Sequence, residues 1–508
     1  MDRITRRDFA AGLVAGGAAL LLPGCGSRYS AARSAVERTA ASIAASNPLR
    51  SLAHELRGPV MLPGSARYRR ARLVYNERYN GRTPRAVVQP VDTDDVQKLV
   101  RWAARNHVRL ATRSGGHSYA GYSTIENGVM VDLRRLRGVR LNRGSGIATI
   151  GPGAQLIDIY TALAAHGATI PGGSCPSVGI GGHSLGGGMG LAGRNLGLAC
   201  DRIRSARIVT AGGRVLLCDP SHHPDLYWAL RGAGGGSFGI VTQLELATAQ
   251  VSHASWFLIS WPWSMASEAL NAWQKLAPHA PAALTSIFTL ATGASHPTVT
   301  AIGQFFGSEA KLRQLIAPLT GIDGASLSIG TSGYLALQRR WAGCIHGSLA
   351  ACHTKGTRPG GTLPRARFAA KSDYVDSPLS GSARAQLVAA VERRQGASGA
   401  LVFDAYGGAI NKVADDATAF VHRDQLFCVQ ELSYFGPSGQ GSALHWLRSV
   451  HSALRPHASG EAYQNYTDPD LAGWRQAYYA SNYARLTQVK ATYDPANQIR
   501  FAQSIGLP

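Results

Sequence analysis

Two glycine-rich stretches constrain the fold of this chain more than any other feature of its sequence. The first is RSGGHS at residues 113–118, and the second is PGGSCPSVGIGGHSLGGG at residues 171–188. Each stretch places a potential nucleophile, the imidazole of His117 or the thiol of Cys175, among glycines that let backbone N–H groups approach a ligand closely. Loops of this kind predict a binding site for a phosphate-bearing ligand.

The composition indicates a large globular protein with a basic surface. A chain of 508 residues with 45% apolar residues exceeds one ordinary domain, so we expect two domains behind a leader. The net charge of +22 raises nucleic acid or an anionic envelope as partners. The arginines are scattered, however, and the sequence carries no zinc-finger or other nucleic-acid signature. We therefore predict a solvated surface and no specific nucleic-acid partner.

Residues 1–30 have the features of an export signal. TRRDF at residues 5–9 precedes an apolar run over residues 10–22, which is too short to span a bilayer as a permanent helix. The arginine pair favours the twin-arginine route, with an ordinary secretory signal as the alternative. LPGC at residues 22–25 also resembles a bacterial lipoprotein cleavage site, which makes Cys25 a candidate for a lipid anchor. We expect an exported bacterial protein, periplasmic, envelope-bound or secreted, that meets a membrane only through this anchor.

Two of the seven cysteines, Cys344 and Cys352, lie in one loop-like stretch that is rich in glycine, alanine and histidine. An exported protein meets an oxidising compartment, so the pair predicts a disulfide. A metal site that uses His346 or His353 is the alternative, but zinc favours tighter CxxC-type spacing and a second cluster of ligands. We therefore predict no metal.

Hydrophobic periodicity predicts alternating strands and helices in the first half of the chain. Helices are expected over residues 92–106, 155–166 and 225–230, and strands over residues 108–111, 129–133, 147–150, 203–209, 214–218 and 240–246. Gly212-Gly213 between two of these strands predicts a hairpin. The glycine run at residues 231–239 follows a helix and opens a strand, which is the reverse of the order in a Rossmann fingerprint. That order excludes a Rossmann fold.

From about Trp256 the composition changes toward strands rich in aromatic and β-branched residues. They are expected over residues 256–263, 284–291, 299–306, 401–406 and 426–434. Helices with apolar stripes lie between them, which predicts an antiparallel sheet with helices on one face. A further helix is expected over residues 471–486.

The two glycine-rich stretches together resemble the berberine-bridge-enzyme-like group of FAD-linked oxidases, within the vanillyl-alcohol-oxidase family. The resemblance extends from about Thr83 to Pro508 and includes AYQNYTD at residues 462–468 and YDPAN at residues 493–497. It implies that FAD is bound twice covalently, through His117 at the 8α-methyl carbon and through Cys175 at carbon 6. A small hydroxylated molecule as substrate and molecular oxygen as electron acceptor are the implied partners.

The resemblance also implies an α+β fold with a definite order of domains. Behind the leader, residues 31–79 form a linker and an N-terminal helix, and residues 80–250 form a PCMH-type FAD-binding domain of two subdomains. Residues 251–460 form the antiparallel substrate domain, and residues 461–508 return to the FAD domain. The implied FAD contacts, besides the two tethers, are Arg113, Ser114, Gly115, Gly116, Ser118, Gly181, Gly182, Ile240, Val241 and Asn497.

Catalysis by such an enzyme needs a base for the substrate hydroxyl, while the cofactor supplies the redox step. By resemblance, Tyr466 is the first candidate for the base and Tyr463 the second. A free tyrosine titrates near pH ~10, so a catalytic one needs a lowered pKa. Either tyrosine could instead be a packing aromatic whose hydroxyl is hydrogen-bonded.

The expected strand over residues 426–434 carries a further candidate. Plant alkaloid-forming relatives have a glutamate base on the corresponding strand, and Gln430 takes that place here, with Glu431 beside it. Strand alternation lets only one of the two face the flavin. If that residue is Gln430, it orients the substrate, which argues against berberine-type ring closure and for oxidation of an alcohol or sugar. Val178 matches the position that gates oxygen in relatives, and valine suits an oxidase.

The predicted function is therefore an FAD-dependent oxidase. It moves a hydride from a hydroxyl-bearing carbon of a sugar, alcohol or secondary metabolite to FAD and then to O2, with H2O2 as product. A dehydrogenase of the same fold that uses another acceptor, and a non-catalytic basic protein that binds the envelope, are the alternatives.

Overall fold

A four-stranded sheet carries the first glycine-rich loop. In the computed structural model, which describes residues 48–293, 296–394 and 397–508, β2 (Ala86–Val88) and β3 (Leu110–Arg113) run parallel to β4 (Val129–Asp132). β1 (Val60–Met61) pairs antiparallel with β2 at the other edge, and α4 (Thr93–Arg105) connects β2 to β3. RSGGHS therefore begins at the carboxyl end of a parallel strand.

A five-stranded antiparallel sheet follows, in the order β5 (Val139–Asn142), β6 (Ile147–Ile150), β10 (Gly239–Ala247), β8 (Ile203–Thr210) and β9 (Val215–Cys218). The predicted hairpin is confirmed, because β8 pairs antiparallel with β9 and Gly213 between them has a φ of +75°. Apolar side chains of the sheet share one core with α5 (Leu156–Ala164), α6 (Ile180–Leu185) and α8 (Pro224–Ala229). The other elements of this half are α2 (Pro48–Glu55), α3 (Ala66–Ala71), α7 (Gly193–Leu196) and a small sheet of β7 (Ala168–Thr169) and β11 (Ala249–Gln250).

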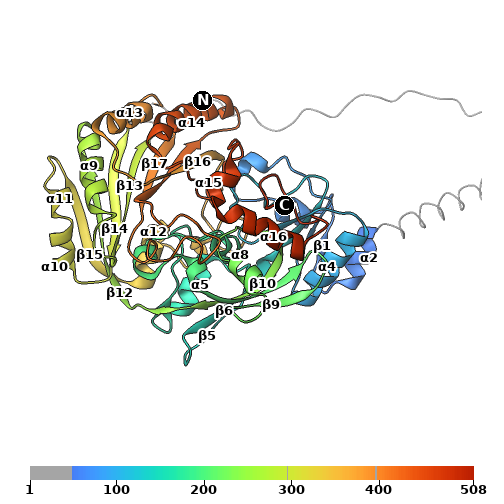
Figure 1. The fold of residues 1–508 in the computed structure, drawn as a ribbon. Helices are drawn as coiled ribbons and strands as arrows, with labels where there is room; N and C mark the ends of the chain where they lie inside the picture. Colours follow the sequence, from blue (N-terminus) through green and yellow to red (C-terminus); the bar gives the residue numbers. More distant parts are fainter. Residues whose placement is uncertain (1–47, 294–295, 395–396) are drawn as a thin grey trace, which may run out of the picture. The chain divides into compact units, whose positions relative to one another are not determined.

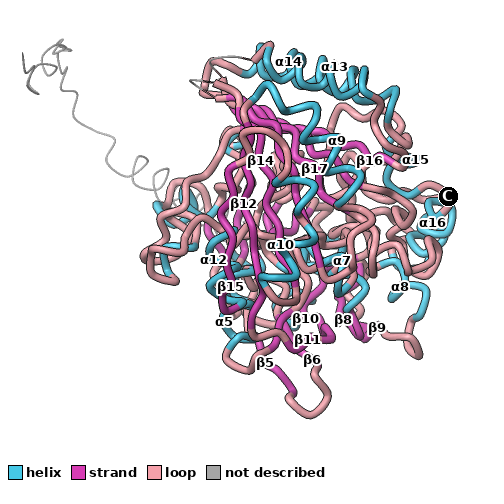
Figure 2. The backbone as a smooth tube through the Cα atoms, turned by 90° about the vertical axis from the view of Figure 1, so that its left-hand side faces the viewer, coloured by secondary structure: helices cyan, strands magenta, loops and turns pink. Residues whose placement is uncertain are grey.

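The second half of the chain forms a seven-stranded antiparallel sheet (Figures 1 and 2). The strand order is β15 (Ser326–Gly333), β12 (His253–Trp261), β14 (Thr298–Phe305), β13 (Leu284–Thr292), β17 (Gly399–Ala405), β18 (Phe427–Tyr434) and β16 (Phe368–Val375). One face packs in a single apolar core against α9 (Ala266–Leu276), α10 (Glu309–Leu315), α11 (Ala317–Thr320), α13 (Gly381–Glu392) and α14 (Gln440–Leu454). The predicted antiparallel sheet with helices on one face is confirmed.

The two edge strands, β15 and β16, are absent from the sequence prediction. β15 has the sequence SLSIGTSG, in which small polar residues and glycines hide the strand pattern. β16 carries Lys371 and Asp373 among apolar residues, yet both are buried. Lys371 pairs with Asp468 at 2.6 Å, and Asp373 pairs with Arg455. These long-range ion pairs make the charges compatible with a buried strand.

The single helix predicted over residues 471–486 is wrong. The structure has α15 (Trp474–Tyr479) and α16 (Asn482–Tyr493), separated at Ala480, whose φ of +40° is incompatible with a continuous helix. The chain then returns to the first half as predicted. The buried ammonium of Lys490 donates to the carbonyl of Ser237, which lies in the glycine run at residues 231–239. The last segment packs there as well, since the N–H of Ile505 donates to the hydroxyl of Ser237.

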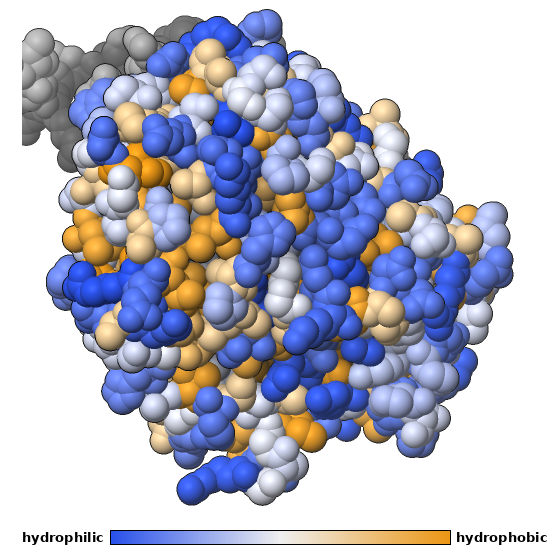
Figure 3. Space-filling model, turned by 60° about the vertical axis from the view of Figure 1, so that its left-hand side comes forward, coloured by the Kyte–Doolittle hydropathy of each residue, from blue (hydrophilic) through white to orange (hydrophobic). Residues whose placement is uncertain are grey.

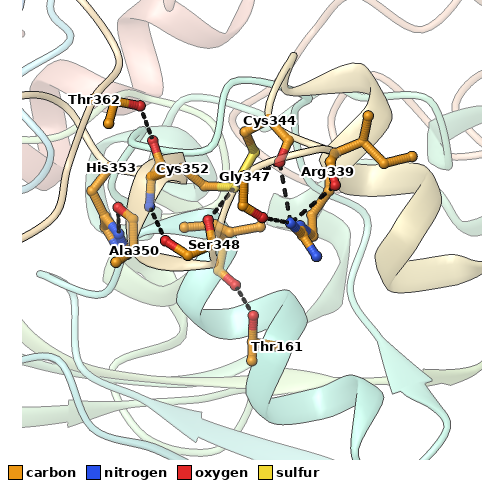
Figure 4. The surroundings of a disulfide bond; sticks show 12 residues. Thr161, Arg339, Cys344, Gly347, Ser348, Ala350, Cys352, His353 and Thr362 are labelled. Carbon is orange, nitrogen blue, oxygen red and sulfur yellow. Dashed lines mark hydrogen bonds between the residues drawn. A yellow bond between two sulfur atoms is a disulfide. The ribbon is translucent and has the colours of Figure 1, made fainter.

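The predicted disulfide between Cys344 and Cys352 is confirmed (Figure 4). It packs against Ile157 of α5 in a small apolar cluster. Both ring nitrogens of His353 have protein partners: Nε2 lies 3.0 Å from Asp158, and Nδ1 lies 3.1 Å from the carbonyl oxygen of Ala350. These contacts attach the disulfide loop, which follows α12 (Tyr334–Trp341), to α5.

The predictions for the export signal and for the anchor at Cys25 lie outside the described residues. Among the residues that the structure describes, none belongs to a helix of the length and apolarity needed to cross a bilayer. On the face drawn in Figure 3, hydrophobic residues are interspersed with hydrophilic ones.

Candidate active site

A cavity of about 650 Å³ lies between the glycine-rich loops, the inner face of the seven-stranded sheet and the C-terminal segment. Its volume is within the range of ~300–1,000 Å³ that is common for cofactor and ligand sites. Most residues predicted from the sequence line it, namely Ser114, Gly115, Gly116, His117, Ser118, Cys175, Gly181, Gly182, Val241, Gln430, Tyr463 and Tyr466. Val178, the candidate oxygen gate, lines it too.

Three predicted residues lie behind or beside this wall. Arg113 is buried, and its guanidinium binds the Asp132 carboxylate at 2.5 Å. This ion pair stabilises the start of the RSGGHS loop. Ile240 is buried inside β10, while its neighbour Val241 reaches the cavity. Asn497 has a φ of +47°, and its buried Oδ1 atom has no hydrogen-bond partner among the described residues.

The two glycine loops contact each other backbone to backbone. A Cβ atom on Gly115 would lie 2.3 Å from the backbone nitrogen of Gly179, and a Cβ atom on Gly179 would lie 2.2 Å from that of Gly115. Only glycine permits this approach. The contact brings the loop of His117 and the loop of Cys175, which are far apart in sequence, to one side of the cavity.

Other glycines leave open space toward the cavity. A Cβ atom on Gly182 would meet no atom within 4 Å, and those on Gly234 and Gly235 would meet none closer than 3.8 Å. All three line the cavity. Bare backbone, serine hydroxyls and two nucleophilic side chains around one cavity fit a dinucleotide with a pyrophosphate and a flavin ring. The residues present therefore fit FAD.

His117 is held on two sides. Its Nε2 atom lies 2.9 Å from the hydroxyl of Ser177, two residues beyond Cys175, and its ring stacks on Tyr75 with centroids 4.0 Å apart. Burial lowers the pKa of His117 to about 3, so the imidazole is neutral and can act as a nucleophile. Desolvation raises the pKa of the Cys175 thiol, although hydrogen bonds from Ser177 and Val178 oppose the shift.

Tyr466 lies in a polar cluster at the wall formed by the sheet. Its hydroxyl is 3.4 Å from Oδ2 of Asp404 on β17, and its ring stacks on Tyr119 with centroids 5.5 Å apart. Burial raises the pKa of Asp404 to about 7 and holds that of Tyr466 well above its ordinary value. The tyrosine is thus a neutral phenol, and the carboxyl group titrates near neutrality.

Sequence reasoning missed Asp404 and Tyr119, and it gave no role to Ser177. One signal was available for Asp404, which is the only charged residue in the strand GALVFDA. No comparable signal distinguishes Tyr119 or Ser177, because their roles depend on contacts with distant residues.

Tyr463 has a different environment. Its hydroxyl accepts hydrogen bonds from the N–H of Gly188 at 2.9 Å and from the side-chain amide of Asn465 at 3.1 Å. Burial also raises the pKa of its phenol. These contacts fasten the C-terminal segment to the second glycine loop, and as donors to the phenol oxygen they oppose part of the rise in the pKa of Tyr463.

Gln430 and Glu431 face opposite sides of β18, as strand alternation requires. The Gln430 amide donates to the hydroxyl of Tyr119 inside the cavity. Glu431 points to the helical face, where it lies 3.2 Å from Nδ1 of His451 on α14. Gln430 is therefore the residue of this pair that faces the cavity.

The fold and the cavity define an FAD-linked oxidoreductase, and comparisons with known proteins agree. The family model described as "FAD binding domain" matches residues 84–219, and the one described as "Berberine and berberine like" matches residues 462–506. The chain is 32% identical over 89% of its length to an uncharacterized FAD-linked oxidoreductase, YgaK, of Bacillus subtilis, of which 97% is covered. The protein belongs to the berberine-bridge-enzyme-like family of FAD-linked oxidoreductases.

Two further relatives have more specific names. A chitooligosaccharide oxidase of Gibberella zeae is 31% identical, with 83% of this chain and 87% of the relative covered. The solved structure of BBE-like 1 from Physcomitrella patens superposes with a TM-score of 0.84 at 30% identity, over 91% of this chain and 99% of the other. The suspected family and the enzyme class are confirmed.

Proposed function

We propose that this enzyme oxidises a hydroxyl-bearing carbon of a sugar, alcohol or secondary metabolite and transfers the electrons to O2, which becomes H2O2. The observation that carries the proposal is the Tyr466–Asp404 pair, at the same cavity as His117 and Cys175. FAD, held by the glycine loops with His117 and Cys175, would supply the redox chemistry, as acceptor of the hydride and donor of electrons to oxygen. Among sugars, oligosaccharides are the favoured class, because a relative is a chitooligosaccharide oxidase.

The residues of this chain handle the proton of the substrate hydroxyl. A tyrosine with a raised pKa is a poor base by itself. We infer a relay in which the Tyr466 oxygen takes the substrate proton while its own proton passes to Asp404. A pKa of about 7 lets Asp404 accept that proton near neutrality. Gln430, bound to Tyr119, is proposed to orient the substrate beside this pair.

The proposed tethers are His117 at the 8α-methyl carbon and Cys175 at carbon 6 of the flavin. Their placement around one cavity, with His117 bound to Ser177 of the Cys175 loop, supports this proposal. We also propose export by the twin-arginine signal, with a lipid anchor at Cys25. The disulfide between Cys344 and Cys352 supports an oxidising compartment.

Two measurements test the proposal. Tryptic peptides of the purified protein should carry flavin on both His117 and Cys175. Oxygen uptake with a panel of chito-, xylo- and cello-oligosaccharides, monosaccharides and alcohols should then reveal turnover that produces H2O2. Reduction of the flavin by a substrate without oxygen uptake would make the protein a dehydrogenase. If no compound in the panel reduces the flavin, the catalytic proposal is wrong.

A further inference from the structure

Ser177 lies between the two residues that are proposed to hold FAD. Its side chain is buried, with 2% exposure, and it does not line the cavity. Its hydroxyl is 2.9 Å from Nε2 of His117. One buried hydroxyl of the Cys175 loop thus contacts the His117 imidazole.

The hydrogen bond between Ser177 and His117 can select the tautomer of the imidazole. A serine hydroxyl can donate or accept. Where it accepts from Nε2–H of His117, the Nδ1 atom carries the lone pair that can form a bond.

Tyr75 completes the arrangement from the other side. Its ring lies nearly parallel to the imidazole, with an interplanar angle of 21°, and prevents the ring of His117 from turning away. The stacking limits the ring to its own plane, and the hydrogen bond to Ser177 selects which nitrogen remains available.

We infer that Ser177 is the positioning residue that prepares His117 for attachment to FAD, by accepting from Nε2–H and leaving Nδ1 to form the bond. The inference rests on the proposed bicovalent cofactor. Each attachment exchanges one C–H hydrogen of the flavin and one N–H or S–H hydrogen for a C–N or C–S bond. The two electrons and two protons released in each exchange pass to O2, which becomes H2O2. Ser177 is regenerated and contributes no atom to either bond.

The experiment measures attachment and not turnover. Full-length protein is produced in riboflavin-depleted cells and mixed with FAD in air, and samples are quenched over time. Flavin on the peptides of His117 and Cys175 is quantified by mass spectrometry. Ser177→Ala removes the hydroxyl, Ser177→Thr keeps it, and Ser177→Val is the isosteric partner of the threonine variant if the alanine variant does not fold.

The alanine and valine variants should attach FAD about two- to tenfold more slowly at His117, the effect expected from one lost hydrogen bond. The threonine variant should restore the wild-type rate. The melting temperature should fall slightly in the alanine and valine variants, because the same hydrogen bond is lost from the fold, while non-covalent FAD affinity should stay unchanged, which separates positioning of His117 from a role in FAD binding. A wild-type rate at His117 in the alanine or valine variant, or no rescue by a folded threonine variant, would overturn the inference while the proposed function stands. If the wild-type protein attaches no FAD, the proposed tethers fail and this inference fails with them.

Discussion

The hydroxyl of Tyr466 and the carboxyl of Asp404 meet at the cavity wall, 3.4 Å apart, although they lie on the C-terminal segment and on a strand of the seven-stranded sheet. Because burial raises the pKa of both groups, a tyrosinate is unfavourable near neutrality, and the Asp404 carboxylate is the group that is available to accept a proton. We therefore propose that the pair acts as one unit, in which either residue alone lacks part of the base.

Replacing Asp404 with asparagine should remove the final proton acceptor. We expect kcat to fall by about 10²–10⁴-fold, the usual contribution of a general base, while KM changes little. In the wild-type enzyme, kcat should rise with pH through about 7, because Asp404 accepts a proton only when ionised. Steady-state kinetics across this range would show the rise in the wild type and not in the variant. An asparagine variant that keeps the rise would assign it to another group.

Phenylalanine variants should separate the two tyrosine candidates. Tyr466→Phe should lower kcat strongly without changing the free energy of unfolding by more than about 1 kcal/mol, since its hydroxyl makes one long hydrogen bond. Tyr463→Phe should destabilise the fold by about 1–3 kcal/mol, because the Gly188 N–H and the Asn465 amide lose their acceptor. Urea denaturation and kinetics on the same samples test both expectations. The reverse pattern would make Tyr463 the base.

These contacts also mark how far the sequence could be interpreted. The glycine-rich loops, and the rule that only one of Gln430 and Glu431 can face the cavity, were predicted because both follow from local backbone geometry. Asp404 and Ser177 were missed because their partners are distant in the sequence and only folding brings them together. β16 was missed for the same reason, since its charges are neutralised by residues far along the chain. The break at Ala480 was missed because nothing local in an alanine predicts a positive φ.

The ion-pair network on the helical face of β18 should make stability depend on pH. His451 contacts the buried carboxylates of Asp373 at 3.0 Å and Glu431 at 3.2 Å, and they raise its pKa to about 10. A raised histidine pKa stabilises the fold below the unfolded pKa of ~6.5, and this stabilisation is lost as pH rises through the folded pKa. Burial raises the pKa of Glu431 to about 7, which has the same sign. Arg455 and Lys371 also face this network.

We therefore expect the free energy of unfolding to fall as pH increases from 4.5 to about 7 because of Glu431, and from 6.5 to about 10 because of His451. His451→Gln should flatten this dependence and lower stability most at the acid end. Chemical denaturation at several pH values measures both effects, and an equal loss at every pH would indicate a packing role for His451 without a role for its charge.

The disulfide should stabilise the fold by closing a short loop. A cross-link between Cys344 and Cys352, eight residues apart, reduces the conformational entropy of the unfolded chain. This raises the free energy of unfolding by about 2–3 kcal/mol. The Cys344→Ser/Cys352→Ser double variant should therefore melt at a lower temperature than the wild type. A reductant should lower the melting temperature of the wild type toward that of the variant and leave the variant unchanged. If the reductant affects both proteins equally, the cross-link is not the cause.

A pair of glycine variants should distinguish a side chain that fills the FAD cavity from one that crowds the protein backbone. Gly182 faces open cavity space, so Gly182→Leu meets no protein atom near its Cβ and should leave the stability of the FAD-free protein nearly unchanged. Its side chain would occupy cavity space, and we expect the affinity for FAD to fall by about tenfold or more, because overpacking costs about 1–3 kcal/mol.

Gly153→Ala is the matched control, because Gly153 does not line the cavity and a Cβ atom there would lie 1.9 Å from the carbonyl oxygen of Leu133. That backbone contact has little freedom to relax, so this variant should lose about 1–3 kcal/mol of unfolding free energy even without FAD. Denaturation of the FAD-free proteins and titration with FAD distinguish the two effects. Normal FAD affinity in the Gly182→Leu variant would place the cofactor elsewhere, since a side chain at that position cannot coexist with a ligand that lies against the bare backbone of the second glycine loop.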